Sequence, residues 1–334
     1  MTPYFLGIDI GATKSHALVA DEDGRALGFG RAGPGNHQDV GYEGMSAALR
    51  EAAAEALSMA GISMEQVAGA GFGIAGFDWP SQRPRMLETV RHALGMDRGV
   101  PVAVTNDVML GLVAGTNEGW GVALSAGTSN NCRGRDRLGR EGRVTGEGSQ
   151  FGEYGGGHEL VAKALHAVTA AWSLRGPDTR LTEALVEYVG ARDVDDLLEG
   201  ISQRYYFLSS EAAPIVFDVA SSGDRVAREV IAWAGRELGD LAVGVIRQLG
   251  FERTTFDVVL SGSLFEGGPV LTGPLGETVH AVAPGARLKR LAAPPVIGAV
   301  LIGMEEAGLD PGPRRAMLAR TTRELRKLPL AEIL

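Results

Sequence analysis

The fold of this chain is decided by residues 4–15, which read YFLGIDIGATKS. The alternating apolar run predicts a strand, and Gly11 predicts a tight turn into a second strand over residues 16–20. Backbone amides at a glycine turn can approach an anion closely, Thr13 adds a hydroxyl donor, and Asp9 could orient a hydrated cation. The hairpin therefore suits a polyphosphate, although its spacing is not that of a Walker A loop. A glycine that serves only the turn geometry is the alternative.

Composition bounds the class of protein. The chain has 334 residues, of which 45% are hydrophobic, and this is enough to fill two ordinary cores. Its formal charge of −9 argues against a surface for nucleic acid or anionic membranes. The single cysteine, Cys132, excludes a disulfide framework and an all-cysteine zinc or iron–sulfur site within one chain.

No stretch of the sequence indicates export or membrane insertion. The N-terminus lacks the basic region and the long apolar segment of a signal peptide. The longest mainly apolar run, residues 291–304, contains Pro294 and Pro295 and is too short to span a bilayer. The sequence therefore predicts a soluble, cytoplasmic protein, and its 48 glycines suit the many tight turns of an α/β chain.

Strands and helices alternate through the first part of the chain. Further strands are predicted over residues 26–31, 67–74 and 101–105, and helices over residues 45–60, 82–94 and 108–114. Residues 71–76, GFGIAG, match the dinucleotide-binding fingerprint. That fingerprint must open a helix, whereas Pro80 and Pro84 delay any helix here. Close packing of the strand is the better explanation for these glycines.

The opening pattern returns twice. Residues 122–130, VALSAGTSN, again run from a strand into a turn of glycine and hydroxyl residues, and a second strand and a polar turn over residues 135–142 follow. A third turn, Ser261-Gly262-Ser263, follows the strand predicted over residues 256–260. This echo of residues 6–25 suggests two domains that share one topology.

The domain boundaries are expected at changes of composition. An N-terminal domain over residues 1–115 ends at the polar break 115–119, and a C-terminal domain covers residues 116–305 with a helical insertion over about 176–222. Residues 306–334 form a basic helix and tail. This tail either packs back on an acidic face of the N-terminal domain or presents a plain solvated face.

Four short motifs, in their order and spacing, resemble the actin-like ATPase superfamily of sugar kinases. They are the turn over residues 9–14, the pair Asn106-Asp107, the turn over residues 126–129 and the turn over residues 261–263. Within the superfamily the chain is similar to the N-acetylglucosamine kinase and BadF/BadG/BcrA/BcrD ATPase family over residues 4–304. The resemblance implies an α/β fold of two ribonuclease H-like domains with a nucleotide cleft between them.

The resemblance also implies a reaction. An ATP-dependent kinase would phosphorylate a hydroxyl, expected to be the 6-hydroxyl, of an amino sugar such as N-acetylglucosamine or glucosamine. Asp107 would be the general base that takes the proton from this hydroxyl, since phosphoryl transfer otherwise needs mainly positioning and charge stabilisation. The alternative is that Asp107 only caps the helix that follows it.

ATP and Mg²⁺ are the implied cofactors. Asp9 would act on Mg²⁺ through water, because this ion tends to keep several of its waters. The residues expected at the nucleotide are Gly11, Ala12, Thr13, Lys14, Gly127, Thr128, Ser129, Gly262 and Ser263.

The residues expected at the sugar are Asn36, His37, Asn106, Asp107, Thr128 and Glu153. Asn36 could instead serve only as a turn residue. The chain departs from relatives close to the acetylglucosamine kinases at residues 152–156, which read GEYGG where those relatives have GDEGS. Glu153 keeps an acceptor with one more methylene of reach, whereas Tyr154 replaces an acid. We therefore expect an altered sugar pocket.

Other functions occur on this fold. Activators of 2-hydroxyacyl-CoA dehydratases hold an iron–sulfur cluster between two subunits, and one cysteine directly after the phosphate turn suits this role poorly. A zinc-containing repressor or kinase would show a cluster of His and Cys and a helix-turn-helix before residue 4. A non-catalytic sugar or nucleotide sensor stays open, and sugar-dependent ADP release would separate it from an enzyme. The expected partner is a small-molecule sugar, without nucleic acid or membrane, and a homodimer is left open.

Overall fold

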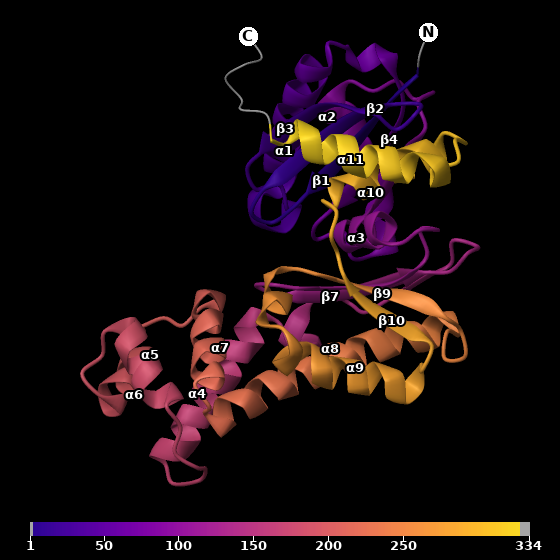
Figure 1. Cartoon of the computed structure of the whole chain (residues 1–334). Helices are drawn as coiled ribbons and strands as arrows, with labels where there is room; N and C mark the ends of the chain where they lie inside the picture. Colours follow the sequence, from indigo (N-terminus) through magenta and orange to yellow (C-terminus); the bar gives the residue numbers. More distant parts are fainter. Residues whose placement is uncertain (1–2, 328–334) are drawn as a thin grey trace. The chain divides into compact units, whose positions relative to one another are not determined.

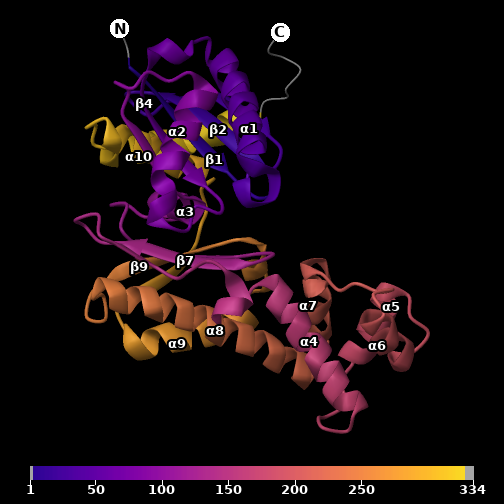
Figure 2. The same cartoon turned by 180° about the vertical axis from the view of Figure 1, so that it is seen from behind.

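The computed structural model describes residues 3–327. The chain divides into two compact units, the first made of residues 1–123 and 291–334 and the second of residues 124–290. Figures 1 and 2 show the elements of each unit. The division differs from the boundaries expected after residues 115 and 305, because residues 291–305 return to the first unit. Of the predicted tail, residues 328–334 lie outside the described residues, as do residues 1–2 of the N-terminal domain.

The first unit is a five-stranded sheet with helices. Its strands are β1 (Tyr4–Ile10), β2 (Ser15–Asp21), β3 (Ala26–Ala32), β4 (Val67–Ile74) and β5 (Val102–Asn106). Its helices are α1 (His37–Ala60), α2 (Arg83–Leu94), α3 (Asp107–Gly115), α10 (Val296–Glu306) and α11 (Arg315–Leu325), with 3-10 turns η1 (Met64–Gln66), η2 (Pro80–Gln82) and η6 (Gly312–Arg314). The strand order is β3-β2-β1-β4-β5, and β1, β4 and β5 are parallel. The carboxyl ends of these three strands therefore meet at one edge of the sheet.

The second unit repeats this plan. Its strands are β6 (Gly121–Ala126), in which the division falls, β7 (Asn130–Arg135), β8 (Glu141–Arg143), β9 (Phe256–Ser261) and β10 (Ala286–Arg290). Its helices are α4 (Gly157–Trp172), α5 (Leu181–Val189), α6 (Val194–Ser202), α7 (Ala213–Ser221), α8 (Arg225–Leu249) and α9 (Pro269–Val282), with 3-10 turns η3 (Gly148–Phe151), η4 (Ser210–Ala212) and η5 (Ser263–Gly267).

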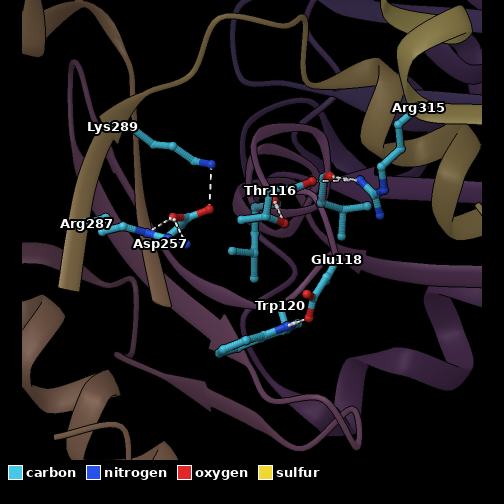
Figure 3. A network of polar contacts seen from close by, with 9 residues as sticks. Thr116, Glu118, Trp120, Asp257, Arg287, Lys289 and Arg315 are labelled. Carbon is cyan, nitrogen blue, oxygen red and sulfur yellow. Dashed lines mark hydrogen bonds and ion pairs between the residues drawn. The ribbon is translucent and has the colours of Figure 1, made fainter. Parts of the chain in front are cut away.

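The second sheet has the order β8-β7-β6-β9-β10. If β6 to β10 are matched in sequence with β1 to β5, this is the order of the first sheet. The predicted echo of one topology is confirmed. Helices α8 and α9 lie side by side on one face of this sheet (Figures 1 and 2). Asp257 of β9 ties the parallel neighbour β10 through ion pairs with Arg287 at 2.8 Å and Lys289 at 2.5 Å (Figure 3). In residues 3–327, no helix combines the length and apolar character needed to cross a membrane.

Strand β1 shows why the first sheet is buried on both faces. Leu6, Ile8 and Ile10 belong to the cluster that packs with α1 and α2, whereas Phe5 belongs to the cluster that packs with α10. This alternation follows the two-residue period of a strand. On the α10 side, a Cβ at Gly7 would lie 2.3 Å from the backbone nitrogen of Val300, so helix and strand backbones meet directly.

The glycines of residues 71–76 serve the same packing. A Cβ at Gly71 would lie 2.1 Å from the carbonyl oxygen of Ala299 in α10, and a Cβ at Gly73 would lie 2.3 Å from the side chain of Leu110 in α3. These residues lie within or directly after β4 and open no helix. The expectation that they allow close strand packing is confirmed.

The basic helix α11 lies against the edge strand β3 of the first unit (Figure 1). The hydroxyl of Thr321 accepts a hydrogen bond of 2.9 Å from the backbone amide of Ala26, and Leu318 is fully buried in the core. The guanidinium of Arg326 lies over the ring of Phe29 at 5.6 Å. The helix therefore docks through an apolar and hydrogen-bonded face.

Candidate active site

The first turn of the chain is a tight glycine turn, as predicted. The amide of Gly11 donates to the carbonyl of Lys14 at 3.2 Å, and a Cβ at Gly11 would lie 2.6 Å from that oxygen. Any side chain would therefore widen the turn between β1 and β2. Ala12, Thr13 and Lys14 are exposed at its tip, where their polar groups can reach a ligand.

Two carboxylates lie at the carboxyl edge of the first sheet. Asp9 is the penultimate residue of β1, and Asp107 is the first residue of α3, directly after β5. Burial is the main reason why the pKa of Asp9 is raised to about 8; the charge of Asp107 raises it further and that of Lys14 opposes the shift. A pair of like charges held in this way favours either a proton or a cation beside Asp9.

Asp107 is not the residue that caps α3. The cap is Asn106, whose side-chain oxygen accepts from the amide of Val108 at 3.1 Å. Asp107 stands one position inside the helix and also accepts from Val108, at 3.0 Å. Asn106 therefore holds the N-cap position of α3, and Asp107 adds a second acceptor for the same amide.

Asn106 is directed into the protein. It is 2% exposed, and its side-chain amide donates to the carbonyl of Phe77 at 3.2 Å and to the carboxylate of Asp78 at 3.1 Å. With its oxygen on Val108, all of its polar atoms have protein partners. Asn106 therefore orients the carboxylate of Asp78 and fixes the start of α3.

Asp78 is a buried carboxylate that the sequence analysis missed. It follows β4, is 5% exposed, and its backbone amide donates to the side chain of Gln82 at 3.0 Å. The signal was present, because β4 is parallel to β1 and β5, and polar residues after parallel strands meet at one edge.

Asn36 and His37 lie at the start of α1, near this edge. Asn36 caps the helix by accepting from the amide of Gln38 at 3.0 Å, and a Cβ at Gly76 would lie 2.4 Å from its side-chain oxygen. Burial lowers the pKa of His37, and the carboxylate of Asp78 opposes that shift. The structure thus brings Asn36 and His37 together with the loop after β4, and the helix begins earlier than the predicted residue 45.

The second unit holds the other two turns. The amide of Gly127 donates to the carbonyl of Ser129 at 2.9 Å, and the first amides of α4, Gly157 and His158, donate to Gly127 and Thr128 at 2.8 and 3.1 Å. Thr128 and Ser129 are exposed. The positive end of α4 therefore lies directly behind the second turn, an arrangement that favours anions.

The third turn joins the second in one cavity. Gly262 has a φ of +101°, and a Cβ there would lie 2.1 Å from the carbonyl oxygen of Ala126, so only glycine allows the two turns to meet. A cavity of about 470 Å³ opens beside them. It is lined by Gly127, Thr128 and Ser263 of the turns, by Leu264 and Gly267 of η5 and by Pro214 and Phe217 of α7, among others. Its volume falls in the range of small-molecule sites.

Glu153 holds a loop. The side chain is 6% exposed, and its carboxylate accepts from the amides of Thr145 at 2.6 Å, Gly146 at 2.8 Å and Glu147 at 3.1 Å. The side chain of the neighbouring Tyr154 packs near Trp233 instead, with 6.0 Å between the two ring centroids. The extra methylene of Glu153 is thus used to reach backbone amides of residues 145–147.

Known proteins resemble this chain over most of its length. It is 26% identical to the N-acetyl-D-glucosamine kinase of Dictyostelium discoideum over 312 residues, which cover 90% of this chain and 97% of that protein. It is 25% identical to the N-acetylmuramic acid/N-acetylglucosamine kinase of Clostridium acetobutylicum over 306 residues, which cover 91% and 99%.

A solved structure, described as a candidate N-acetylglucosamine kinase from Chromobacterium violaceum, has the same fold. The TM-score is 0.65 at 19% identity, with 90% of this chain and 98% of the other covered. The model of one protein family matches residues 6–303, which include all four motifs that carry the resemblance. The chain therefore belongs to the BadF/BadG/BcrA/BcrD ATPase family.

Proposed function

We propose that this protein is an ATP-dependent kinase of an amino sugar, with N-acetylglucosamine as the first candidate and its 6-hydroxyl as the acceptor. The observation that carries the proposal is the carboxylate of Asp107, which stands at the sheet edge beside Asp9 while Asn106 fills the capping position. The two relatives named as N-acetylglucosamine kinases support the substrate class.

Asp107 acts as the general base. It accepts the proton of the sugar hydroxyl as that oxygen attacks the γ-phosphate, and one carboxylate suffices because the transfer depends mainly on positioning and charge stabilisation. Asn106 supports this role, because its side chain makes three hydrogen bonds, with Val108 at the start of α3, with the carboxylate of Asp78 and with the carbonyl of Phe77. Asn36 and His37 supply polar atoms for the sugar hydroxyls or its acetamido group.

Asp9 is the residue best suited to Mg²⁺. Among residues 3–327, no three His, Cys, Asp or Glu side chains gather into a metal-binding group. Mg²⁺ in phosphoryl-transfer sites needs only one or two carboxylates and completes its shell with water and phosphate oxygens. The raised pKa of Asp9 fits a position where a cation relieves the repulsion between Asp9 and Asp107. The ion would supply charge neutralisation at the phosphates.

The glycine turns hold the nucleotide. Each unit has a turn that suits phosphate oxygens. The turn of the first unit offers the amides of residues 11–14, the hydroxyl of Thr13 and the ammonium group of Lys14, and the turn of the second offers Gly127, Thr128 and Ser129. Ser263 lines the 470 Å³ cavity, which takes the nucleoside, and Gly262 lets the third turn approach the second. Thr128 also faces the sugar, and Glu153 shapes the pocket by fixing the loop over residues 145–147. Because ATP is the donor, we place the protein in the cytoplasm.

A screen of acceptors tests this proposal. Purified protein with ATP and Mg²⁺ is offered N-acetylglucosamine, glucosamine, N-acetylmuramic acid and glucose, and ADP release is recorded for each. We expect release that depends on an amino sugar, with phosphorus NMR of the product showing a 6-phosphate. Sugar binding without turnover would indicate a sensor, and release that no sugar alters would contradict a sugar kinase.

A further inference from the structure

Helix α11 is an addition to the part of the chain that the family model covers. That model matches residues 6–303, whereas α11 begins at Arg315. The helix nevertheless belongs to the first unit and buries Leu318 in its core. Arg314, just before it, donates to the carbonyl of Glu22 at 2.8 Å, and Thr321 accepts from Ala26. This segment is therefore built into the unit that carries Asp107.

The first residue of α11 reaches the end of α3. The guanidinium of Arg315 donates to the carbonyl of Val113 and, at 3.1 Å, to that of Thr116 (Figure 3). Another carbonyl of this turn, that of Leu112, accepts from the amide and the hydroxyl of Thr116. A cation on these carbonyls satisfies groups that have no partner inside the helix and complements the negative end of its dipole.

Helix α3 joins this contact to Asp107. The helix has nine residues, so its two ends are only about 14 Å apart. Helix α10 holds its flank, since a Cβ at Gly298 would lie 2.1 Å from the carbonyl oxygen of Leu110. At the other end stand Asn106 and Asp107. A short, well-hydrogen-bonded helix moves as one body, so a shift at its carboxyl end also displaces its amino end.

We propose that Arg315 is a positioning residue, which fixes α3 from its carboxyl end and so sets the place of the Asp107 carboxylate. The basic tail is then a latch on the helix that carries the base. This inference rests on the proposed role of Asp107 as general base. A displacement of about 1 Å can cost up to about 100-fold in rate, so the latch matters to catalysis although it touches no substrate.

The test compares Arg315→Ala with Arg323→Ala, which removes an exposed arginine of the same helix. We expect Arg315→Ala to lower kcat by about 10- to 100-fold with the KM for ATP unchanged. The kcat of Arg315→Lys should fall less, because the lysine ammonium can still donate a hydrogen bond to one of the carbonyls. Guanidinium chloride at millimolar concentration, far below unfolding concentrations, should restore part of the rate to Arg315→Ala and none to Arg323→Ala.

Hydrogen exchange gives a readout that is independent of turnover. Peptides that cover residues 104–116 should exchange faster in Arg315→Ala than in wild type or Arg323→Ala. Unchanged exchange and kcat in Arg315→Ala would overturn the latch. If Arg315→Ala does not fold, Arg315→Lys carries the same comparison. Wild-type protein without sugar-dependent turnover would refute the proposed function instead, while the exchange result would still decide whether Arg315 holds α3.

Discussion

At the scale of single residues, some polar side chains of the candidate site already form hydrogen bonds with the protein's own backbone. Asn106 and Glu153 were predicted at the sugar, and the structure gives both of them backbone partners. Asp107 stands one position inside α3 and accepts from the amide of Val108, and Asp9 is close enough for their charges to interact. The residues that we propose to meet a ligand thus have buried polar neighbours, of which Asn106 is the example beside Asp107.

The raised pKa of Asp9 makes a pH-dependent prediction. Burial raises the pKa of Asp9 from its ordinary value of 3.8 to about 8. Between these values the folded state binds more protons than the unfolded state, so the Asp9 contribution favours folding at low pH and is lost as the pH rises. Relative to wild type, Asp9→Asn should therefore gain stability from about pH 4 to about pH 8.

Urea unfolding at several pH values, without nucleotide or Mg²⁺, measures that difference. One pKa unit corresponds to about 1.4 kcal/mol, so we expect a gain of a few kcal/mol at most. Asp21→Asn, at the other end of the hairpin, is the matched control and should show no comparable trend. A difference between Asp9→Asn and wild type that stays constant with pH would contradict the shifted pKa.

The hydrogen bonds of Glu153 to the loop over residues 145–147 lead to a second prediction at this scale. In Glu153→Gln, three backbone amides lose the charge of their shared acceptor. We expect the free energy of unfolding to fall by about 1.5–3 kcal/mol and the KM for the sugar to rise. Glu141→Gln, at an exposed position of β8, is the control. An equal, small change in both variants would show that Glu153 does not hold the loop.

At the scale of elements, α10 matters because it lies directly on strand backbones. Gly71→Ala would place a methyl group 2.1 Å from the carbonyl oxygen of Ala299. We expect a loss of about 1–3 kcal/mol of stability, since overpacking forces the helix and the strand apart. Gly33→Ala is the control, because a Cβ there meets nothing within 4 Å. Thermal unfolding compares the two variants, and similar Tm values would contradict direct contact between α10 and β4.

At the scale of the whole molecule, the sequence predicted the repeated strand-and-turn topology better than the residues at which the two units begin and end. The three glycine turns and their strands were predicted correctly, because strand, glycine and hydroxyl follow one another in the chain. The return of residues 291–305 to the first unit was not predicted, because nothing local shows which sheet a small-residue helix will cover. The place of Asp78 in the site was not predicted for a related reason, since its hydrogen-bond partner Asn106 is 28 residues away in the sequence.

The proposed reaction depends on Asp107, and the most direct measurement is sugar-dependent ADP release by Asp107→Asn beside wild type. We expect kcat to fall by about 100- to 10,000-fold, while the KM for ATP and the unfolding temperature change little. Asp23→Asn, at an exposed position of the turn between β2 and β3, should keep the wild-type rate. Turnover of Asp107→Asn at the wild-type rate would contradict the account.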